Sequence, residues 1–132
     1  MKNYLLYPLL LLLAVFTLTA CSGGKPEDTV ETFFKAAAQG DTDKAIDQIS
    51  FASVSANEMV QARGKVQMIV GEVQNRINAN DGFDSVETLN SVISDDGNQA
   101  TIQSQINYGN GKSSTENTRL VKIDGDWKIS LD

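Results

Sequence analysis

The sequence lacks histidine entirely and has only one cysteine and two prolines among its 132 residues. Without histidine, the commonest general base of enzymes is missing and a Ser-His-Asp triad cannot form. The single cysteine, Cys21, excludes an intramolecular disulfide. The fold must therefore be stabilised by packing alone.

Motifs that bind metals, phosphates or cofactors are also missing. The sequence has no cluster of Cys, His or carboxylate ligands with metal-site spacing, and no glycine-rich phosphate loop. Short acidic segments such as Asp95-Asp96-Gly97-Asn98 do not follow the calcium-loop pattern and are typical of turns. We therefore expect no metal site and no cofactor.

Basic residues are few, with 11 lysine and arginine residues against 17 aspartate and glutamate residues. An acidic surface without a basic cluster repels phosphate backbones, so we expect no nucleic-acid partner. Repulsion from anionic lipid likewise indicates that the surface of the domain does not hold the protein on a membrane.

The one long apolar run, from Leu5 to Leu18, has 14 residues, whereas a helix needs roughly 20 to span a bilayer. Pro8 interrupts this run, and a positively charged start precedes it. A charged start, a short apolar run and a small residue before a cleavage site are typical of a secretory signal peptide.

The segment that follows, Leu18-Thr19-Ala20-Cys21, resembles the lipobox of bacterial lipoproteins. In those proteins a diacylglycerol is attached to the cysteine thiol and the signal peptide is cut just before it. The resemblance implies a signal peptide over 1–20, a lipidated Cys21 with a short tether over 21–25, and one domain over 26–132. Acyl chains such as palmitate on Cys21 would then hold the protein on the membrane; an uncleaved anchor is the alternative.

The residue after Cys21 indicates the destination of the protein. In the lipoproteins that the chain resembles, an acidic residue at this position favours the inner membrane, and here the residue is Ser22. The resemblance thus implies the outer membrane, on its periplasmic side. The tether stretches to roughly 14 Å at most, so we expect the domain to lie close to the membrane.

Three helical patterns open the domain. The first covers 26–40, a short second one follows Asp41, and a long third one covers 58–78 with Asn57 as its cap. Gly64 and Gly71 lie together on the far side of the third helix. We interpret them as tolerated surface glycines, although a kink or a closely approaching backbone is the alternative. The first helix has one apolar stripe, formed by Val30, Phe33, Phe34 and Ala37.

Beyond Asp81-Gly82 the spacing of the apolar residues changes from a helical period to every second residue, which predicts strands. In the first strand the apolar residues change parity between Val86 and Ile93, so a bulge or burial of both faces is expected. Three helices followed by a four-stranded antiparallel meander make an α+β fold. The hairpin signals are Asp96-Gly97, Asn110-Gly111 and Asp124-Gly125. The predicted strands are Phe83–Ser94, Gln99–Tyr108, Ser113–Ile123 and Trp127–Leu131.

Both ends of the domain resemble those of nuclear transport factor 2-like (NTF2-like) domains. Residues 26–41 follow the pattern P-x-x-x-V-x-x-F-x-x-A-x-x-x-G-D, and residues 121–129 are similar to their last hairpin with its D-G-x-W-K-I pattern. Bacteria carry many small lipoproteins with this domain, among them a group described as lumazine-binding-like or of unknown function. The resemblance implies a cone, in which a curved sheet wraps around the long helix and leaves a pocket between its concave face and the first helix.

Four aromatic residues are candidates to line such a pocket: Phe33, Phe34, Tyr108 and Trp127. Each also fits the core, and for Tyr108 we favour a core position with its hydroxyl bonded at the rim. Enzymatic members of the family place an Asp, His or Tyr in the pocket. Among the strands, we expect no acidic residue at an inward position.

We therefore expect a non-enzymatic, lipid-anchored envelope protein that binds a small apolar ligand or a protein partner. One alternative is an isomerase- or dehydratase-like enzyme of the same fold that uses an Asp/Tyr pair. Another is a scaffold that forms a homodimer through the exposed face of its sheet.

Overall fold

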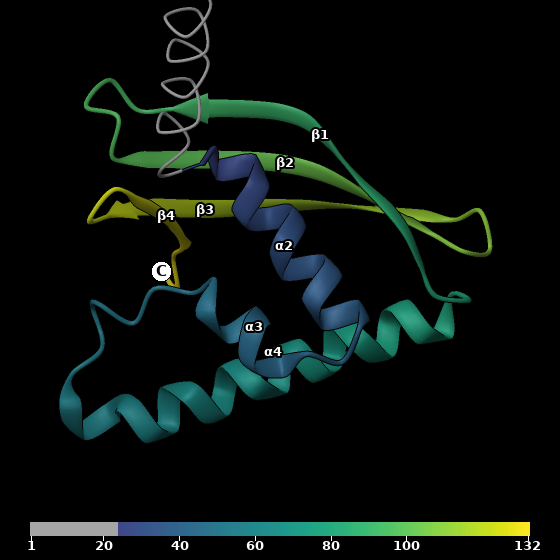
Figure 1. Ribbon diagram of the computed structural model, residues 1–132, viewed down its shortest axis with the longest axis horizontal. Helices are drawn as coiled ribbons and strands as arrows, with labels where there is room; N and C mark the ends of the chain where they lie inside the picture. Colours follow the sequence, from purple (N-terminus) through teal and green to yellow (C-terminus); the bar gives the residue numbers. More distant parts are fainter. Residues whose placement is uncertain (1–23) are drawn as a thin grey trace, which may run out of the picture.

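The computed structural model describes residues 24–132, so the predicted signal peptide and Cys21 lie outside the described part. In Figure 1 the four strands and the helix α4 lie one below another, and α2 crosses in front of them. No helix in the described part is long and apolar enough to span a bilayer. The elements are α2 (Pro26–Ala38), α3 (Thr42–Asp47), the 3₁₀ turn η3 (Ala56–Glu58), α4 (Met59–Ala79), β1 (Phe83–Ile93), β2 (Gln99–Tyr108), β3 (Ser113–Ile123) and β4 (Asp126–Ile129).

The ends of α2 follow from its sequence. Pro26 begins the helix, and two acidic residues in the first turn face the positive end of the helix dipole. At the other end, Gly40 adopts a φ of 74°. Its N–H bonds to Ala37 O at 3.1 Å and Asp41 N bonds to Ala36 O at 2.9 Å, which is a Schellman motif. The predicted start at Pro26 and the termination at Gly40 are confirmed, although the last helical residue is Ala38.

The start of α4 differs from the prediction. The chain already coils as η3, so Asn57 lies inside this turn and is not the cap of the helix. The Ser55 hydroxyl instead bonds to the Glu58 carboxylate at 3.0 Å. The segment 51–55 contains no strand.

The sheet is an antiparallel meander in the order β1-β2-β3-β4. The register of β1 on β2 shifts between Thr88 and Asn90, which confirms the bulge. The alternative prediction, that both faces of β1 are buried, is wrong, because Leu89 and Val92 are about half exposed. The α+β fold with three helices on a four-stranded sheet is confirmed.

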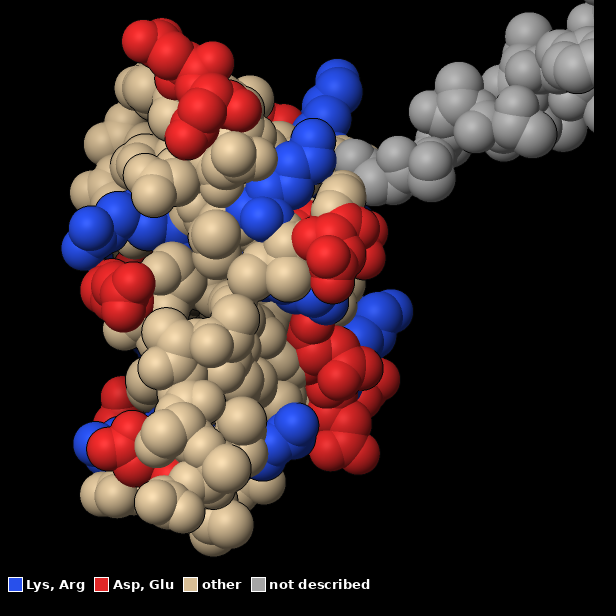
Figure 2. Space-filling model, turned by 90° about the vertical axis from the view of Figure 1, so that its left-hand side faces the viewer, with Lys and Arg blue, Asp and Glu red and all other residues tan. Residues whose placement is uncertain are grey.

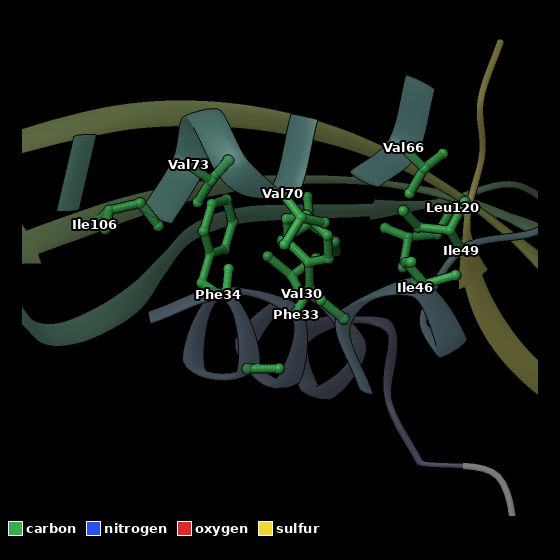
Figure 3. Close-up of a cluster of buried hydrophobic side chains, with 14 of the residues drawn as sticks. Val30, Phe33, Phe34, Ile46, Ile49, Val66, Val70, Val73, Ile106 and Leu120 are labelled. Carbon is green, nitrogen blue, oxygen red and sulfur yellow. The ribbon is translucent and has the colours of Figure 1, made fainter. Parts of the chain in front are cut away.

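The core fills the space between the concave face of the sheet and helices α2 and α4 (Figure 3). The sheet supplies Ile102 and Ile106 from β2 and Leu120 from β3, and all three are almost completely buried. Within residues 24–132, the core residues lie between Val30 and Trp127.

The end of α4 is tied to the β2–β3 hairpin by a backbone contact. Gly109 N donates to Gly82 O at 2.9 Å, and Asn110 N donates to Asn80 O at 3.1 Å. A Cβ atom on Gly109 would overlap the carbonyl oxygen of Asp81. The hairpin can dock here only because residue 109 has no side chain.

We predict opposite effects of alanine at two glycines. Gly109→Ala should lower the free energy of unfolding by roughly 2 kcal/mol or more, because the added Cβ atom would clash with the backbone carbonyl of Asp81. Gly64→Ala should raise it by about 1 kcal/mol, because a Cβ there meets nothing within 4 Å and alanine favours the helix. Urea unfolding followed by circular dichroism measures both. A destabilising Gly64→Ala would contradict the interpretation of Gly64 as a tolerated surface glycine.

Candidate functional site

A cavity of about 700 Å³ lies between α4, β3 and the last residues of the chain. This volume is within the roughly 300–1,000 Å³ range of small-molecule sites. Its apolar floor includes Phe33 and Phe34 from α2, whose rings are 5.3 Å apart and edge to face. The apolar side chains of Ile49, Val73 and Ile129 also line it. The residues of the apolar stripe on α2 thus contribute both to the core and to the cavity floor.

A smaller hollow of about 250 Å³ shares part of its lining, including Arg119 and Leu131, with the cavity. It lies between the segment at Ser50 and the end of β3. Figure 2 views this end of the molecule, where an uncharged band runs between charged side chains. The larger cavity has the aromatic floor, so we regard it as the candidate site.

Charged side chains face each other across the mouth of the cavity. Arg76 on α4 and Glu116 on β3 form an ion pair of 2.8 Å, and each side chain is between 30 and 45% exposed. Glu72 and Arg119 also line the mouth. The pair links the long helix directly to the sheet.

The position of Glu116 corrects the sequence analysis, which expected no acidic residue on the inward side of the strands. Glu116 pairs with the buried Ser104 and shares its strand parity with the buried Leu120. Its carboxylate therefore belongs to the concave face. In the sequence, the apolar Leu120 indicated that even-numbered residues of this strand face inward. The apolar Val121 and Ile123 suggested the odd-numbered residues instead, so the inward face of the strand was ambiguous.

A row of polar residues crosses the concave face from Thr88 through Ser104 to Glu116. Ser104 is 1% exposed, and its hydroxyl has no hydrogen-bond partner within residues 24–132. An unsatisfied buried hydroxyl costs roughly 1–3 kcal/mol. Ser104 is the cross-strand neighbour of the cavity-lining Glu116, but it is not itself among the lining residues.

The aromatic candidates divide into two groups. Phe33 and Phe34 line the cavity, whereas Tyr108 and Trp127 are not among its lining residues. The Tyr108 hydroxyl lies 2.7 Å from Ser114 Oγ, and the side chain is buried. The Trp127 carbonyl accepts a hydrogen bond from Thr29 Oγ1 at 3.0 Å, and the Lys122 ammonium lies over its ring.

Metal-ligand groups and shifted pKa values are two further features that can mark a functional site. Residues 24–132 contain no group of three His, Cys, Asp or Glu side chains that could hold a metal ion. The Ser94 hydroxyl and the Asn98 backbone N–H lower the pKa of Asp96, but this carboxylate belongs to the β1–β2 turn. The shift has a structural cause, which is the geometry of the turn.

Comparisons with known proteins identify a family and a fold. A family model described as a domain of unknown function (DUF4878) matches residues 19–130. No curated protein matches the sequence. A crystal structure from Campylobacter jejuni, provisionally described as an NTF2-like transpeptidase, matches with a TM-score of 0.75 and 23% identity. The match covers 83% of this chain and 100% of that chain. At this identity the likeness concerns the fold alone, which is NTF2-like, and the transpeptidase description applies to that protein.

We predict that Arg76→Met lowers the free energy of unfolding by less than about 1 kcal/mol, because the ion pair is partly exposed. The loss should shrink at roughly 1 M salt, where such pairs are screened. Urea unfolding at low and high salt measures it. Lys35→Met is the control, since it removes the exposed Lys35–Glu31 pair on α2. A loss of several kcal/mol that salt does not change would mean that the Arg76 pair behaves as a buried one.

Proposed function

The chain belongs to the family described as a domain of unknown function (DUF4878), and we propose that it is a non-enzymatic binding module of the cell envelope. An acylated Cys21 holds it on the outer membrane, facing the periplasm. The cavity between α4 and β3 receives an apolar guest, which is either a small molecule or the apolar side chains of a protein partner.

The observation that carries this proposal is the cavity itself. A space of about 700 Å³ with an aromatic floor and a charged mouth suits a guest with an apolar body and a polar end. Removing apolar surface from water contributes roughly 25 cal/mol per Å². Phe33 and Phe34 are already buried, so Ile69 and Leu131, which are 47% and 39% exposed, offer a guest more apolar surface. The charged mouth orients the guest.

The contacts of the candidate acid–base residues favour binding over catalysis. The Tyr108 hydroxyl is engaged with Ser114, and this side chain does not line the cavity. Three carboxylates line the cavity, from Glu72, Glu116 and Asp132, but no tyrosine does, and the carboxylate of Glu116 is engaged by Arg76 at 2.8 Å. An Asp/Tyr pair of the kind that an isomerase or dehydratase would need is therefore missing from the lining.

The outer face of the sheet does not favour a scaffold that dimerises through it. Such a scaffold needs an apolar outer face. Val121 and Ile123 lie at one end of this face, but along its middle β2 presents amide side chains. These side chains belong to Gln103, Gln105 and Asn107.

The membrane anchor is supported by the lipobox-like segment ending at Cys21 and by the short distance to the domain. Lys25 is exposed and α2 begins at the next residue, so a tether of four residues separates the cysteine from the folded domain. Ser22 after the cysteine supports the outer membrane.

We predict that the protein binds a neutral apolar probe, N-phenyl-1-naphthylamine, in the cavity. Ile69→Trp should weaken this binding at least tenfold, because Ile69 lines the cavity and a larger side chain fills its mouth. Val60→Trp is the matched control, since Val60 lies on another side of α4 and is 85% exposed. Probe fluorescence during titration measures both. Equal effects of the two variants would contradict binding in the cavity.

We predict that Cys21→Ala abolishes acylation. Cells that express the full chain should incorporate radiolabelled palmitate into the protein and retain it in the outer-membrane fraction. In Cys21→Ala the label should disappear and the precursor should remain uncut, because the thiol is the attachment point. Ser22→Ala, which keeps the thiol, is the control. Label that persists in Cys21→Ala would contradict the anchor.

A further inference from the structure

One wall of the cavity is an unpaired strand edge. β4 pairs only with Leu120–Ile123, the last four residues of β3. Within residues 24–132 no strand pairs with 113–119 on the side away from β2. The outer edge of β4 is closed, because Ile129 forms a parallel bridge with Ile49. The open stretch of the sheet on this side is therefore confined to β3.

The register identifies which backbone groups are free. Tyr108 N donates to Lys112 O, and Lys122 N donates to Asn98 O, so even-numbered positions from 112 to 122 direct their backbone groups at β2. On the other side, Arg119 O accepts from Ser130 N at 2.8 Å. The alternation places the N–H and C=O of Thr115 and Asn117 on the open edge.

The two outer strand edges of the sheet differ in a way that favours pairing at β3. β1 carries two register shifts, one near Asp84 and one near Leu89, and such bulges protect an edge from pairing. β3 pairs with β2 without any shift from Ser113 to Val121. Its open stretch contains no proline and no lysine. It does contain two charged residues, Glu116 and Arg119, and Arg76 neutralises Glu116 in the ion pair.

The remaining walls complete a groove. α4 lies opposite the open edge and contributes Glu72, Val73 and Arg76, and the phenylalanines of α2 form the floor. A strand edge beside a helix over an apolar floor suits strand addition. In that mode, main-chain hydrogen bonds give affinity and pockets for alternate side chains give specificity.

We propose that this groove binds an extended segment of a partner protein, which adds to β3 as a further strand in line with β4. Thr115 and Asn117 bond its backbone, and every second side chain enters the cavity. The inference rests on the proposed function and identifies the apolar guest as these side chains.

The chemistry of the segment follows from the groove. Seven unpaired residues give roughly 23 Å of edge, enough for a strand of six or seven residues. Alternate residues must be apolar, and proline is excluded where an N–H bonds to β3. Three carboxylates line the cavity, from Glu72, Glu116 and Asp132, against the cations Arg76 and Arg119. The chain has a net charge of −6, so a neutral or basic segment is favoured.

The test uses protein produced from the full sequence and a phage-displayed library of random seven-residue peptides. Enriched peptides should alternate apolar residues with other residues. Their binding should slow hydrogen exchange at the amides of Thr115 and Asn117 at least tenfold. Failure to enrich any peptide, or protection confined to other amides, would overturn the proposal.

Two variants of one residue separate backbone pairing from side-chain contact. Asn117→Pro removes an edge N–H that bonds nothing in the domain, and proline is tolerated on edge strands. Asn117→Ala removes the same side chain and keeps the N–H. Peptides should bind Asn117→Pro at least tenfold more weakly than Asn117→Ala, because only the proline variant lacks the edge N–H. Equal binding to both variants would overturn strand addition.

N-methylated peptides repeat the test without altering the protein, so misfolding of Asn117→Pro cannot obscure the result. Methylation of alternate backbone nitrogens should abolish binding on one parity and leave it unchanged on the other. Loss on both parities, or on neither, would overturn the proposal.

Two further outcomes identify other occupants of the groove. If the protein alone is a dimer and its Thr115 and Asn117 amides become protected with rising concentration, the partner is a second copy and the proposal fails. If the apolar probe binds and Ile69→Trp blocks it while no peptide binds, the proposed function stands and this inference alone fails.

Discussion

The register of β3 on β2 is the constraint on which the candidate site depends. Tyr108 N bonds to Lys112 O, so three residues, Gly109 to Gly111, form the loop between the strands. Gly109 can occupy this loop because its missing Cβ lets the hairpin dock against the Asp81 carbonyl at the end of α4. A shift of one residue would move every side chain of β3 to the other face. The same register therefore turns Glu116 inward and directs the backbone of Thr115 outward.

The shape of the cavity follows from how the helices meet the sheet. α2 packs against the concave face through Val30, Phe33 and Phe34, and α4 packs on α2 through a stripe that ends at Ile77 (Figure 3). α4 reaches β3 through the ion pair between Arg76 and Glu116. The space beside α2 that no side chain fills is the cavity.

The sequence was sufficient to predict the elements, because local signals determine them. The stripe on α2, the glycine at its end and the three hairpin turns place the helices and strands within a few residues. The predicted start of α4 was wrong, because the polar residues before the helix allow a 3₁₀ turn as readily as a cap at Asn57. The comparison with known proteins agrees with the resemblance of the two ends of the domain to NTF2-like domains.

The site was harder to predict, because it depends on pairs of residues far apart in the sequence. Phe33 and Phe34 were candidates because their spacing marks a buried face, and such a face also lines a cavity. Glu116 was missed, since its inward position depends on the register of the β2–β3 hairpin.

The polar row and the open edge have one physical feature in common, which is unsatisfied hydrogen-bonding capacity beside an apolar floor. Ser104 has an unpartnered hydroxyl inside the domain, and Thr115 and Asn117 direct backbone groups at the groove. Water satisfies exposed backbone groups, so hydrogen bonds to the edge add only about 1 kcal/mol each. Apolar burial alone gives affinity without orientation. A guest that uses both must be extended and must alternate apolar side chains, and this requirement distinguishes a polypeptide strand from a free apolar molecule.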